Sequence, residues 1–413
     1  MTTRTVGSGK DYSTIAAALS AANADDTISI DAGTYTEYHL DVYDDGLTIK
    51  AADATAGAPT ENAVILDGEE STSKEYAFYS YASGCLYQHI TFKNYEEYAI
   101  RRGSTDGASL TLSGCLIYGC DGPAISHVGY NASTPTEIYD SIIIVDEGRA
   151  INVGGDSTVI IQNSVLATNN NDEAVLMSSI SYPNVTASHC TFIGRGSNGS
   201  DGRHYHLVSQ VAKVNNCIVY GGDGHGIQAN HHNNNLVYVT HAESNAYVEW
   251  EAATYDSDAV SAGTGDLTGN PTFVATPTQG SITPGLDLRL QKTSPAVDAG
   301  AIASPPTLTD LSGNLRDSLV SRVLTYDPDI GAIEYLRSAS DYQSYGTSSN
   351  VRFRNTGEIL LTTEKISDEY KKLEGIDQAP FSLTARGIIF RNRPKPYIVS
   401  THDDPDSHFS GSS

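Results

Sequence analysis

Short runs of alternating apolar and polar residues recur along the middle of the chain. Between Cys85 and Asn230, six segments align, beginning at Cys85, Leu110, Thr136, Val159, Asn184 and Ala212. One position recurs at steps of 25, 26, 23, 26 and 27 residues, and it holds Ile90, Cys115, Ser141, Ser164, Cys190 and Cys217. A repeat of this length indicates a solenoid, in which each repeat packs only on its neighbours.

Two further apolar positions recur in the same segments. The first lies two residues after the position above and holds Phe92, Ile117, Ile143, Leu166, Phe192 and Val219. The second is an aliphatic residue that follows a small one, in Ala99-Ile100, Ala124-Ile125, Ala150-Ile151, Ala174-Val175 and Gly226-Ile227. We expect matching residues to stack in the interior of successive coils.

The pattern within each repeat predicts strands. Runs of 3–6 residues alternate with period two, are rich in β-branched residues and are separated by Gly, Asn and Asp, whereas helical periodicity is lacking. This favours an all-β fold, a right-handed parallel β-helix whose coils stack at the inter-strand distance of about 4.8 Å. Because burial contributes roughly 1.5–3 kcal/mol per aliphatic side chain, several stacked coils are needed to offset chain entropy.

These repeats resemble the pectate-lyase-like superfamily of right-handed parallel β-helix proteins. That superfamily contains lyases, hydrolases, adhesins and virus tailspikes, so the resemblance implies a fold and leaves the function open.

The chain divides into four expected parts. Residues 1–36 form an N-terminal cap with a short helix that begins near Ser13 and presents Ile15, Leu19 and Ala22 on one face. The predicted order is then the β-helix over 37–286, a closing coil and cap over 287–336, and a C-terminal module over 337–413. The closing segment resembles those that follow β-helix repeats in bacterial and phage proteins.

The C-terminal module differs in charge from the rest of the chain. It holds equal numbers of acidic and basic residues, so the net charge of −25 belongs to residues 1–336. We expect a small α+β module with a hairpin over 351–363 and a helix over 367–375; a solvated tail is the alternative. Its basic residues are the expected anchoring contacts: Arg386, Arg391, Arg393 and Lys395.

Net charge and hydropathy limit the classes of protein to which the chain can belong. An acidic surface argues against nucleic acid as a partner, and against an anionic polysaccharide held by charge alone. No run of 18 apolar residues predicts a membrane span, and residues 1–15 lack the apolar core of a signal peptide. We expect either a trimmed signal or a protein made without secretion.

Five cysteines are an odd number, and three of them share the recurring position described above. Buried free thiols are therefore expected rather than disulfides, which suits assembly in a reducing cytoplasm.

One segment suggests hydrolytic chemistry. Gly222–Ile227 (GDGHGI) resembles the Gly-His-Gly element of polygalacturonase-type hydrolases, which implies His225, with Asp172 and Asp201 as candidate acids, if the protein is an enzyme. The other motifs of that family are lacking, and Gly226-Ile227 also fits the repeat. We therefore favour a structural role for this segment.

A polar ladder recurs three residues before each small residue: Glu96, Asp121, Glu147, Asn171 and Asp223. Stacked carboxylates repel, so the ladder predicts a solvated edge, a bound cation such as Ca²⁺, a glycan site, or paired catalytic acids. Three tyrosines nearby are the expected sugar-stacking residues: Tyr95, Tyr98 and Tyr118. The histidine pairs 204/206 and 231/232 have metal spacing but no supporting ligands, so loops are predicted there.

Together these features favour a non-enzymatic surface protein of a virus particle, a bacteriophage capsid decoration, fibre or spike. Capsid or tail proteins would be its partners, host polysaccharide a possible ligand and a homotrimer a possible state, with assembly in the host cytoplasm. The alternative is a polysaccharide depolymerase of the tailspike kind, a glycoside hydrolase or lyase.

Overall fold

The structure is a computed structural model, and it describes most of the chain. Outside the described residues lie 54–62, 72, 104–107, 129–134, 155–157, 170–175, 179–183, 195–204, 222–224, 240–246, 249–262, 279, 302–309, 313–327, 336–349, 355–357, 363–387, 391–397 and 401–413. The chain forms two compact units, Met1–Arg316 with Asp327–Glu334, and Asp317–Tyr326 with Tyr335–Ser413.

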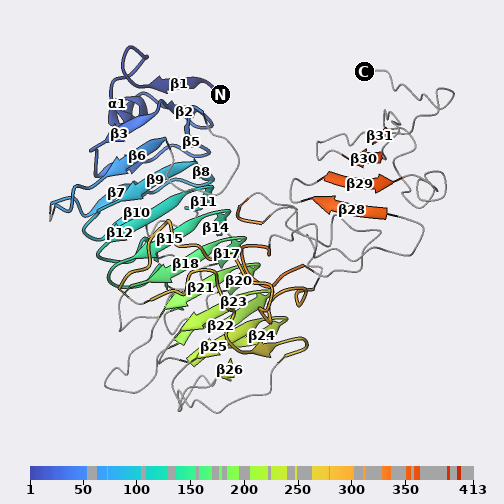
Figure 1. Ribbon diagram of the computed structural model, residues 1–413. Coiled ribbons are helices and arrows are strands. Elements are labelled where there is room, and N and C mark those ends of the chain that lie inside the picture. Colours follow the sequence, from blue (N-terminus) through green and yellow to red (C-terminus); the bar gives the residue numbers. More distant parts are fainter. Residues whose placement is uncertain are drawn as a thin grey trace. The chain divides into compact units, whose positions relative to one another are not determined.

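The first unit is a right-handed parallel β-helix, as the repeats predict (Figure 1). Each full coil contributes one strand to each of three faces, and every pairing between coils is parallel. The first face contains β1 (Thr3–Val6), β2 (Thr27–Ile30), β5 (Thr48–Ala51), β8 (Cys85–Gln88), β11 (Leu110–Ser113), β14 (Thr136–Tyr139), β17 (Thr158–Gln162), β20 (Asn184–Ser188) and parts of β22 (Tyr205–Asn215) and β24 (His225–Asn233).

The other two faces follow in each coil. The second contains β3 (Gly33–Tyr35), β6 (Val64–Asp67), β9 (Ile90–Lys93), β12 (Leu116–Cys120), β15 (Ile142–Val145), β18 (Val165–Thr168), β21 (Thr191–Gly194), β23 (Ile218–Gly221), β25 (Leu236–Val239) and β27 (Leu267–Thr268). The third contains β4 (Leu40–Val42), β7 (Tyr76–Ser80), β10 (Tyr98–Arg102), β13 (Ile125–Val128), β16 (Ile151–Gly154), β19 (Leu176–Ser178), the other parts of β22 and β24, and β26 (Tyr247–Val248).

The predicted interior ladders are confirmed on the second face. Ile117 pairs with Phe92 and Ile143, and Leu166 pairs with Ile143 and Phe192. These five side chains are fully buried.

The polar members of the first ladder are also buried, and their hydrogen bonds explain why Ser and Cys interchange there. Ser141 Oγ donates to Tyr139 O (2.7 Å) and accepts from Cys115 N (3.2 Å). Cys190 Sγ makes the same contact, to Ser188 O at 3.2 Å. A hydroxyl or thiol can thus donate to the carbonyl two residues earlier, which avoids the cost of an unpaired buried polar group.

All five cysteines are buried free thiols, as expected. Burial raises the pKa of the Cys85 and Cys115 thiols to about 11 and that of Cys120 to about 12. The thiols therefore remain protonated at neutral pH, which keeps their reactivity low because the thiolate is the nucleophile.

The corner between the first and second faces is built by one residue with positive φ in each coil. That residue directly precedes the first ladder position, and it is His89, Gly114, Asp140, Asn163, His189, Asn216 or Asn234. Gly adopts the left-handed region because it has no Cβ, and Asn and Asp adopt it because their short polar side chains form local hydrogen bonds. The side chains also stack: Asn163 Nδ2 donates to Asp140 Oδ1 at 2.5 Å.

The third-face ladder needs one correction. Ile100, Ile125 and Ile151 pair in register as predicted. Ile151 then pairs with Leu176 rather than Val175, and Leu176 pairs with Leu207, a rung that the sequence pattern missed. The connection from the second to the third face is longer in this coil, 169–175 between β18 and β19, than in the preceding one, 146–150 between β15 and β16, so spacing alone misplaced the register by one residue.

The N-terminal end is covered by the predicted helix. Helix α1 (Ile15–Ser20) is capped by Thr14, whose side chain accepts from Ala17 N, so the cap lies one residue after Ser13. Ile15 and Leu19 are buried against the first coil, and Ala22 is partly buried there.

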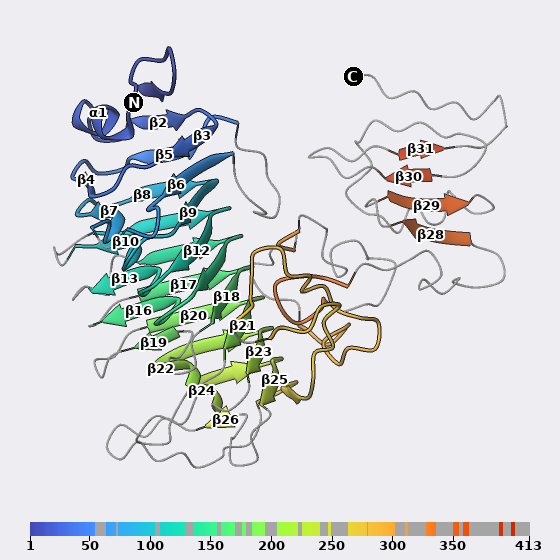
Figure 2. The ribbon, with the colours of Figure 1, turned by 60° about the vertical axis from the view of Figure 1, so that its left-hand side comes forward.

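The segment after β27 differs from the predicted closing coil over 287–336. Its described parts lie along the outer side of the second face (Figure 2). Asn216 donates to Ala301 O (2.8 Å) and accepts from Ala301 N (2.8 Å), while Ala332 N donates to Thr191 Oγ1 (3.1 Å). The strands there turn apolar side chains outward, including Ile193 and Ile218, and the segment buries them.

The second unit contains an antiparallel sheet of β28 (Asn350–Arg354), β29 (Glu358–Thr362), β30 (Ile388–Phe390) and β31 (Ile398–Ser400). β28 and β29 form the predicted hairpin. The helix predicted over 367–375 lies outside the described residues, as do Arg386, Arg391, Arg393 and Lys395, so the helical part and the anchoring role remain predictions. Among the described residues, no helix has the length and hydropathy needed to cross a bilayer.

Candidate functional site

The described acids of the predicted polar ladder, Glu96, Asp121 and Glu147, lie at the corner between the second and third faces. A Cβ on Gly122 would lie 3.0 Å from Glu97 Cα, and one on Gly148 would lie 3.4 Å from Gly122 C, so these residues stack on successive coils. Of the three acids, Glu96 is half-buried and the other two are exposed.

The backbone hydrogen bonds place Asp121 beside Glu96, since Asp121 N donates to Tyr95 O (3.3 Å), and Asp146 beside Asp121, since Asp146 N donates to Cys120 O (3.0 Å). The acid in register with Asp121 is therefore Asp146 rather than Glu147.

The remaining predicted ligands and catalytic residues cannot be placed at this edge. Asn171, Asp223, Asp172 and Asp201 lie outside the described residues. His225 belongs to β24, where its backbone pairs with Tyr205. In the described part of the chain, no group of three or more His, Cys, Asp or Glu side chains is placed to hold a metal ion.

The three predicted sugar-stacking tyrosines do not share a surface. Tyr95 is 1% exposed, and its hydroxyl donates to Glu37 O at 2.9 Å, so its proposed contact with a sugar is wrong. It follows β9 directly, where the chain turns inward. Tyr118 lies on the second face in β12, whereas Tyr98 lies on the third face in β10.

Tyr98 belongs to a larger aromatic surface on the third face of the first coils. We call this set the tyrosine–arginine surface, and it comprises Tyr38, His39, Tyr43, Tyr76, Tyr79, Tyr81, Tyr98 and Arg101. These residues come from β7, β10 and the flanks of β4, and all are exposed or half-buried.

The rings form a continuous series of contacts. Tyr43 stacks on Tyr81 at 5.0 Å between centroids, and Tyr81 stacks on Tyr79 at 4.2 Å. Tyr76 meets Tyr79 edge-on at 5.6 Å and lies 4.4 Å from the ring of His39. Such offset and edge-on contacts hold aromatic rings in fixed orientations.

The β-helix itself sets this arrangement. Asp41, Tyr79 and Arg101 occupy one register position on neighbouring coils, so their side chains lie one strand spacing apart. Gly103 follows on the third coil, where a Cβ would come within 2.8 Å of Tyr81 Cδ1. The ring therefore rests over a position that only glycine can occupy without displacing it.

Arg101 gives the surface a positive charge. Its guanidinium lies 5.0 Å from the centre of the Tyr79 ring and 5.7 Å from that of Tyr98, which favours the cation. No carboxylate among the described residues forms an ion pair with it.

The tyrosine hydroxyls are neutral hydrogen-bonding groups. Burial, with the nearby Tyr79 and Asp41, raises the pKa of Tyr81 to about 12. Burial and the Asp41 charge also raise the pKa of Tyr43 and Tyr76. At neutral pH these hydroxyls therefore keep their protons, and that of Tyr43 donates to Asp41 Oδ2 at 3.2 Å.

The sequence prediction missed most of this surface, although a signal was present. Tyr79 and Tyr81 flank the buried Ser80, and Tyr76 precedes the buried Ala77 and Phe78. Alternating tyrosines within a strand indicate an exposed aromatic face. The contribution of Tyr43 and Arg101 depends on which coils become neighbours, and that pairing is tertiary.

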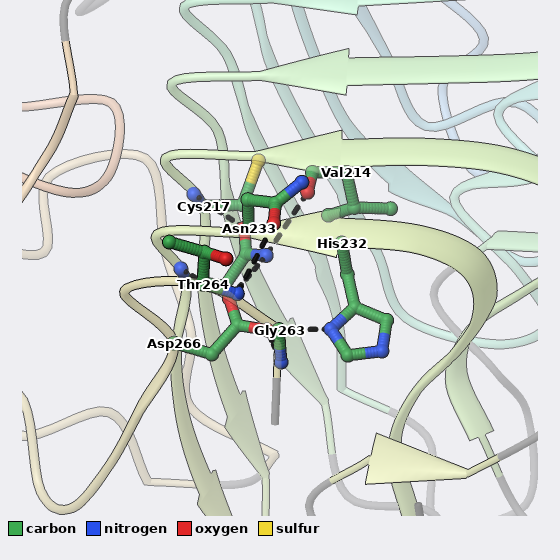
Figure 3. Close-up of polar contacts among 8 residues, drawn as sticks. Val214, Cys217, His232, Asn233, Gly263, Thr264 and Asp266 are labelled. Atoms are coloured by element: carbon green, nitrogen blue, oxygen red, sulfur yellow. Dashed lines mark hydrogen bonds and ion pairs between the residues drawn. The ribbon is translucent and has the colours of Figure 1, made fainter. Parts of the chain in front are cut away.

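A second polar network lies at the far end of the β-helix (Figure 3). Asp266, whose side chain is 0% exposed, accepts from His232 Nδ1 (2.5 Å), Asn235 N (2.8 Å), Asn235 Nδ2 (3.0 Å) and Gly263 N (2.7 Å). His231 and His232 belong to β24, so the loop predicted there is wrong. The network fastens the turn at 263–266 to the last coils, which is a structural role.

Comparisons with known proteins assign no family to this chain. No family model matches the sequence, and no curated protein matches it. Among solved structures, it is similar to pectate lyase Pel9A, at 16% identity and a TM-score of 0.42 over 81% of this chain and 96% of that one.

Two further structures are similar. A rhamnogalacturonan lyase shows 11% identity and a TM-score of 0.41 over 71% of this chain and 97% of that one. The pectin methyl esterase of rice weevil shows 11% identity and a TM-score of 0.37 over 64% and 86%. At this level of identity and TM-score, neither a function nor a catalytic residue is transferred from these enzymes to this chain.

Proposed function

We propose that this protein is a non-enzymatic binding protein that holds a glycan chain on the tyrosine–arginine surface. The observation that carries the proposal is the continuous, solvent-accessible array of stacked tyrosines beside a guanidinium that has no carboxylate partner among the described residues. Sugar rings present a C–H face that packs on aromatic rings, and hydroxyls that bond to tyrosine and arginine.

The geometry favours an extended chain over a single sugar. The surface spans β4, β7 and β10, which are consecutive strands of one parallel face, about 4.8 Å apart. Rings repeat along the axis of the β-helix, and a polysaccharide lying along that axis would meet a ring or a guanidinium on each coil. Fixed rings also limit the entropy lost on binding.

Replacing Tyr43 and Tyr81 by alanine tests the proposal. We expect the double variant to weaken glycan binding at least tenfold, about 1.4 kcal/mol, because the stacked pair is removed. Binding would be measured on an oligosaccharide array of bacterial capsular and neutral glycans, followed by calorimetry. Tyr139→Ala, on the first face, is the matched control and should bind as the unmodified protein does.

Two outcomes would contradict the binding proposal. One is a glycan panel in which nothing binds; the other is a Tyr43→Ala/Tyr81→Ala variant that binds as tightly as the Tyr139→Ala control. The same panel tests the depolymerase alternative, since release of reducing ends or unsaturated sugars would support an enzyme.

We further propose that the glycan-binding β-helix stands on a virus particle and attaches through its C-terminal unit. The supporting features are the net-neutral composition of residues 337–413 beside an acidic β-helix, and the separate compactness of that unit. A module of different charge suits contact with another protein rather than with the solvent-facing glycan.

Charge reversal in the basic arm tests attachment. In the full chain, Arg391→Glu with Arg393→Glu should abolish co-sedimentation with particles while the β-sheet circular dichroism stays unchanged. Arg289→Glu, on the β-helix unit, is the control and should leave attachment intact. Particles that retain the doubly reversed protein would argue against this part of the proposal.

A further inference from the structure

A groove of about 490 Å³ opens on the outer side of the second face, away from the tyrosine–arginine surface. Its floor comes from β12, β15 and β18, through Tyr118, Ile144 and Asn169, and its wall from residues 280–284. Its volume is within the range of small-ligand sites, about 300–1,000 Å³.

The wall is fixed in place by one asparagine. Asn169 Oδ1 accepts from Ile282 N at 2.9 Å, and Asn169 Nδ2 donates to Ile282 O at 3.1 Å. This side chain therefore pairs with the backbone of a segment 113 residues later, as a neighbouring strand would. The groove is thus held by specific hydrogen bonds rather than by a loose crossing of the chain.

A carboxylate lies at the rim of this groove. Asp146 is exposed, and its Oδ1 accepts from Asn169 Nδ2 at 2.9 Å. Within the described residues, Oδ2 accepts no hydrogen bond and no cation pairs with the group. One oxygen is therefore fixed by Asn169, while the other is available to a donor.

The backbone is irregular at this place. The pairing of β12 with β15 shifts between Tyr118 and Cys120, and the intervening Gly119 has φ of +66°. The positive φ favours glycine, and a Cβ there would lie 2.8 Å from Asn94 Oδ1, so the Asn94 side chain would have to shift to admit one. Bulges of this kind re-aim side chains and occur beside binding sites.

From this lining we infer that the groove is a second binding site, specific for a neutral sugar of one or two rings. Among the described residues, the lining contains a carboxylate, a phenol ring and the apolar Ile144, Ile282 and Pro284, but no Lys, Arg or His. Sugar hydroxyls would donate to Asp146 Oδ2, and the C–H face of the ring would pack on Tyr118 and Pro284, which are half-buried. A phosphate or uronate would meet an uncompensated carboxylate in a chain of net charge −25.

This site goes beyond the proposed function, since it would stand even if the tyrosine–arginine surface bound nothing. The test uses the full chain carrying Tyr43→Ala and Tyr81→Ala, with glucose, galactose, mannose, N-acetylglucosamine and their disaccharides as probes. Saturation-transfer NMR should detect at least one of them, and glucuronate and galacturonate should give no transfer.

Variants in the groove then assign the signal. Asp146→Ala and Tyr118→Ala should each lower the affinity for the sugar at least tenfold. Asp121→Asn, on the adjacent acidic edge, should leave the affinity unchanged. Thermal melting checks that each variant is folded, and Asp146 is exposed, so its loss spares the core. The inference is overturned if no neutral sugar binds, if the uronates bind equally well, or if both alanine variants bind normally.

Discussion

Replacing Phe192 by alanine is expected to lower the free energy of unfolding of the β-helix by about 3–5 kcal/mol, the usual cost of truncating a buried aromatic side chain. Phe192 is fully buried on β21 and pairs with Leu166 on one side and Val219 on the other. Its loss leaves a cavity between two stacked coils, which the rigid ladder cannot close. Chemical denaturation followed by circular dichroism measures the change.

The matched control for Phe192 is Thr186→Ala in β20, a half-buried position between the buried Val185 and Ala187. It should change the free energy of unfolding by less than about 0.5 kcal/mol, because little of its side chain is removed from the core. Equal effects of Phe192→Ala and Thr186→Ala would mean that the ladder is not the core of the fold.

Replacing Asp266 by alanine is expected to have a comparable effect, about 3–5 kcal/mol, as for other buried charged groups whose partners are left behind. The carboxylate accepts hydrogen bonds from His232, Asn235 and Gly263. Without it, several buried donors lose their acceptor, each at roughly 1–3 kcal/mol. We expect the last coils to open first, detected as faster amide hydrogen exchange in β24 and β25.

Asp287→Ala is the control for the Asp266 substitution. Asp287 pairs with Arg289 on the surface, where both side chains are partly exposed. The free energy of unfolding should fall by less than about 1 kcal/mol, as for other exposed ion pairs. If Asp266→Ala left exchange in β24 unchanged, the network would not be what fastens the end of the β-helix.

The comparison of prediction with structure separates local from distant information. Ladder positions such as Ile117 and Ile143 were predictable because strand periodicity and repeat length can be read from short stretches of sequence. The helix at Ile15–Ser20 and the burial of all five thiols followed from the same kind of pattern.

Errors arose where the outcome depends on contacts between distant segments. Tyr95 was expected at the surface because it is a tyrosine beside the polar ladder. The turn after β9 instead carries it inward, where its hydroxyl donates to the carbonyl of Glu37, 58 residues earlier. The closing segment was expected to add a coil; the outward apolar residues on the second face, such as Ile193, instead offer a surface that it covers. Both are decided by what lies next to the residue in space.

The sequence by itself therefore determined the coil, its lining and its corners, because each repeat carries the same local signals and stacking repeats them. Only the tertiary structure decided which exposed residues become neighbours. It brings Tyr43, Tyr81 and Arg101 onto one face from three coils, and it brings Ile282 to Asn169. Surfaces depend on the relative placement of coils and of distant segments, which the local pattern does not encode.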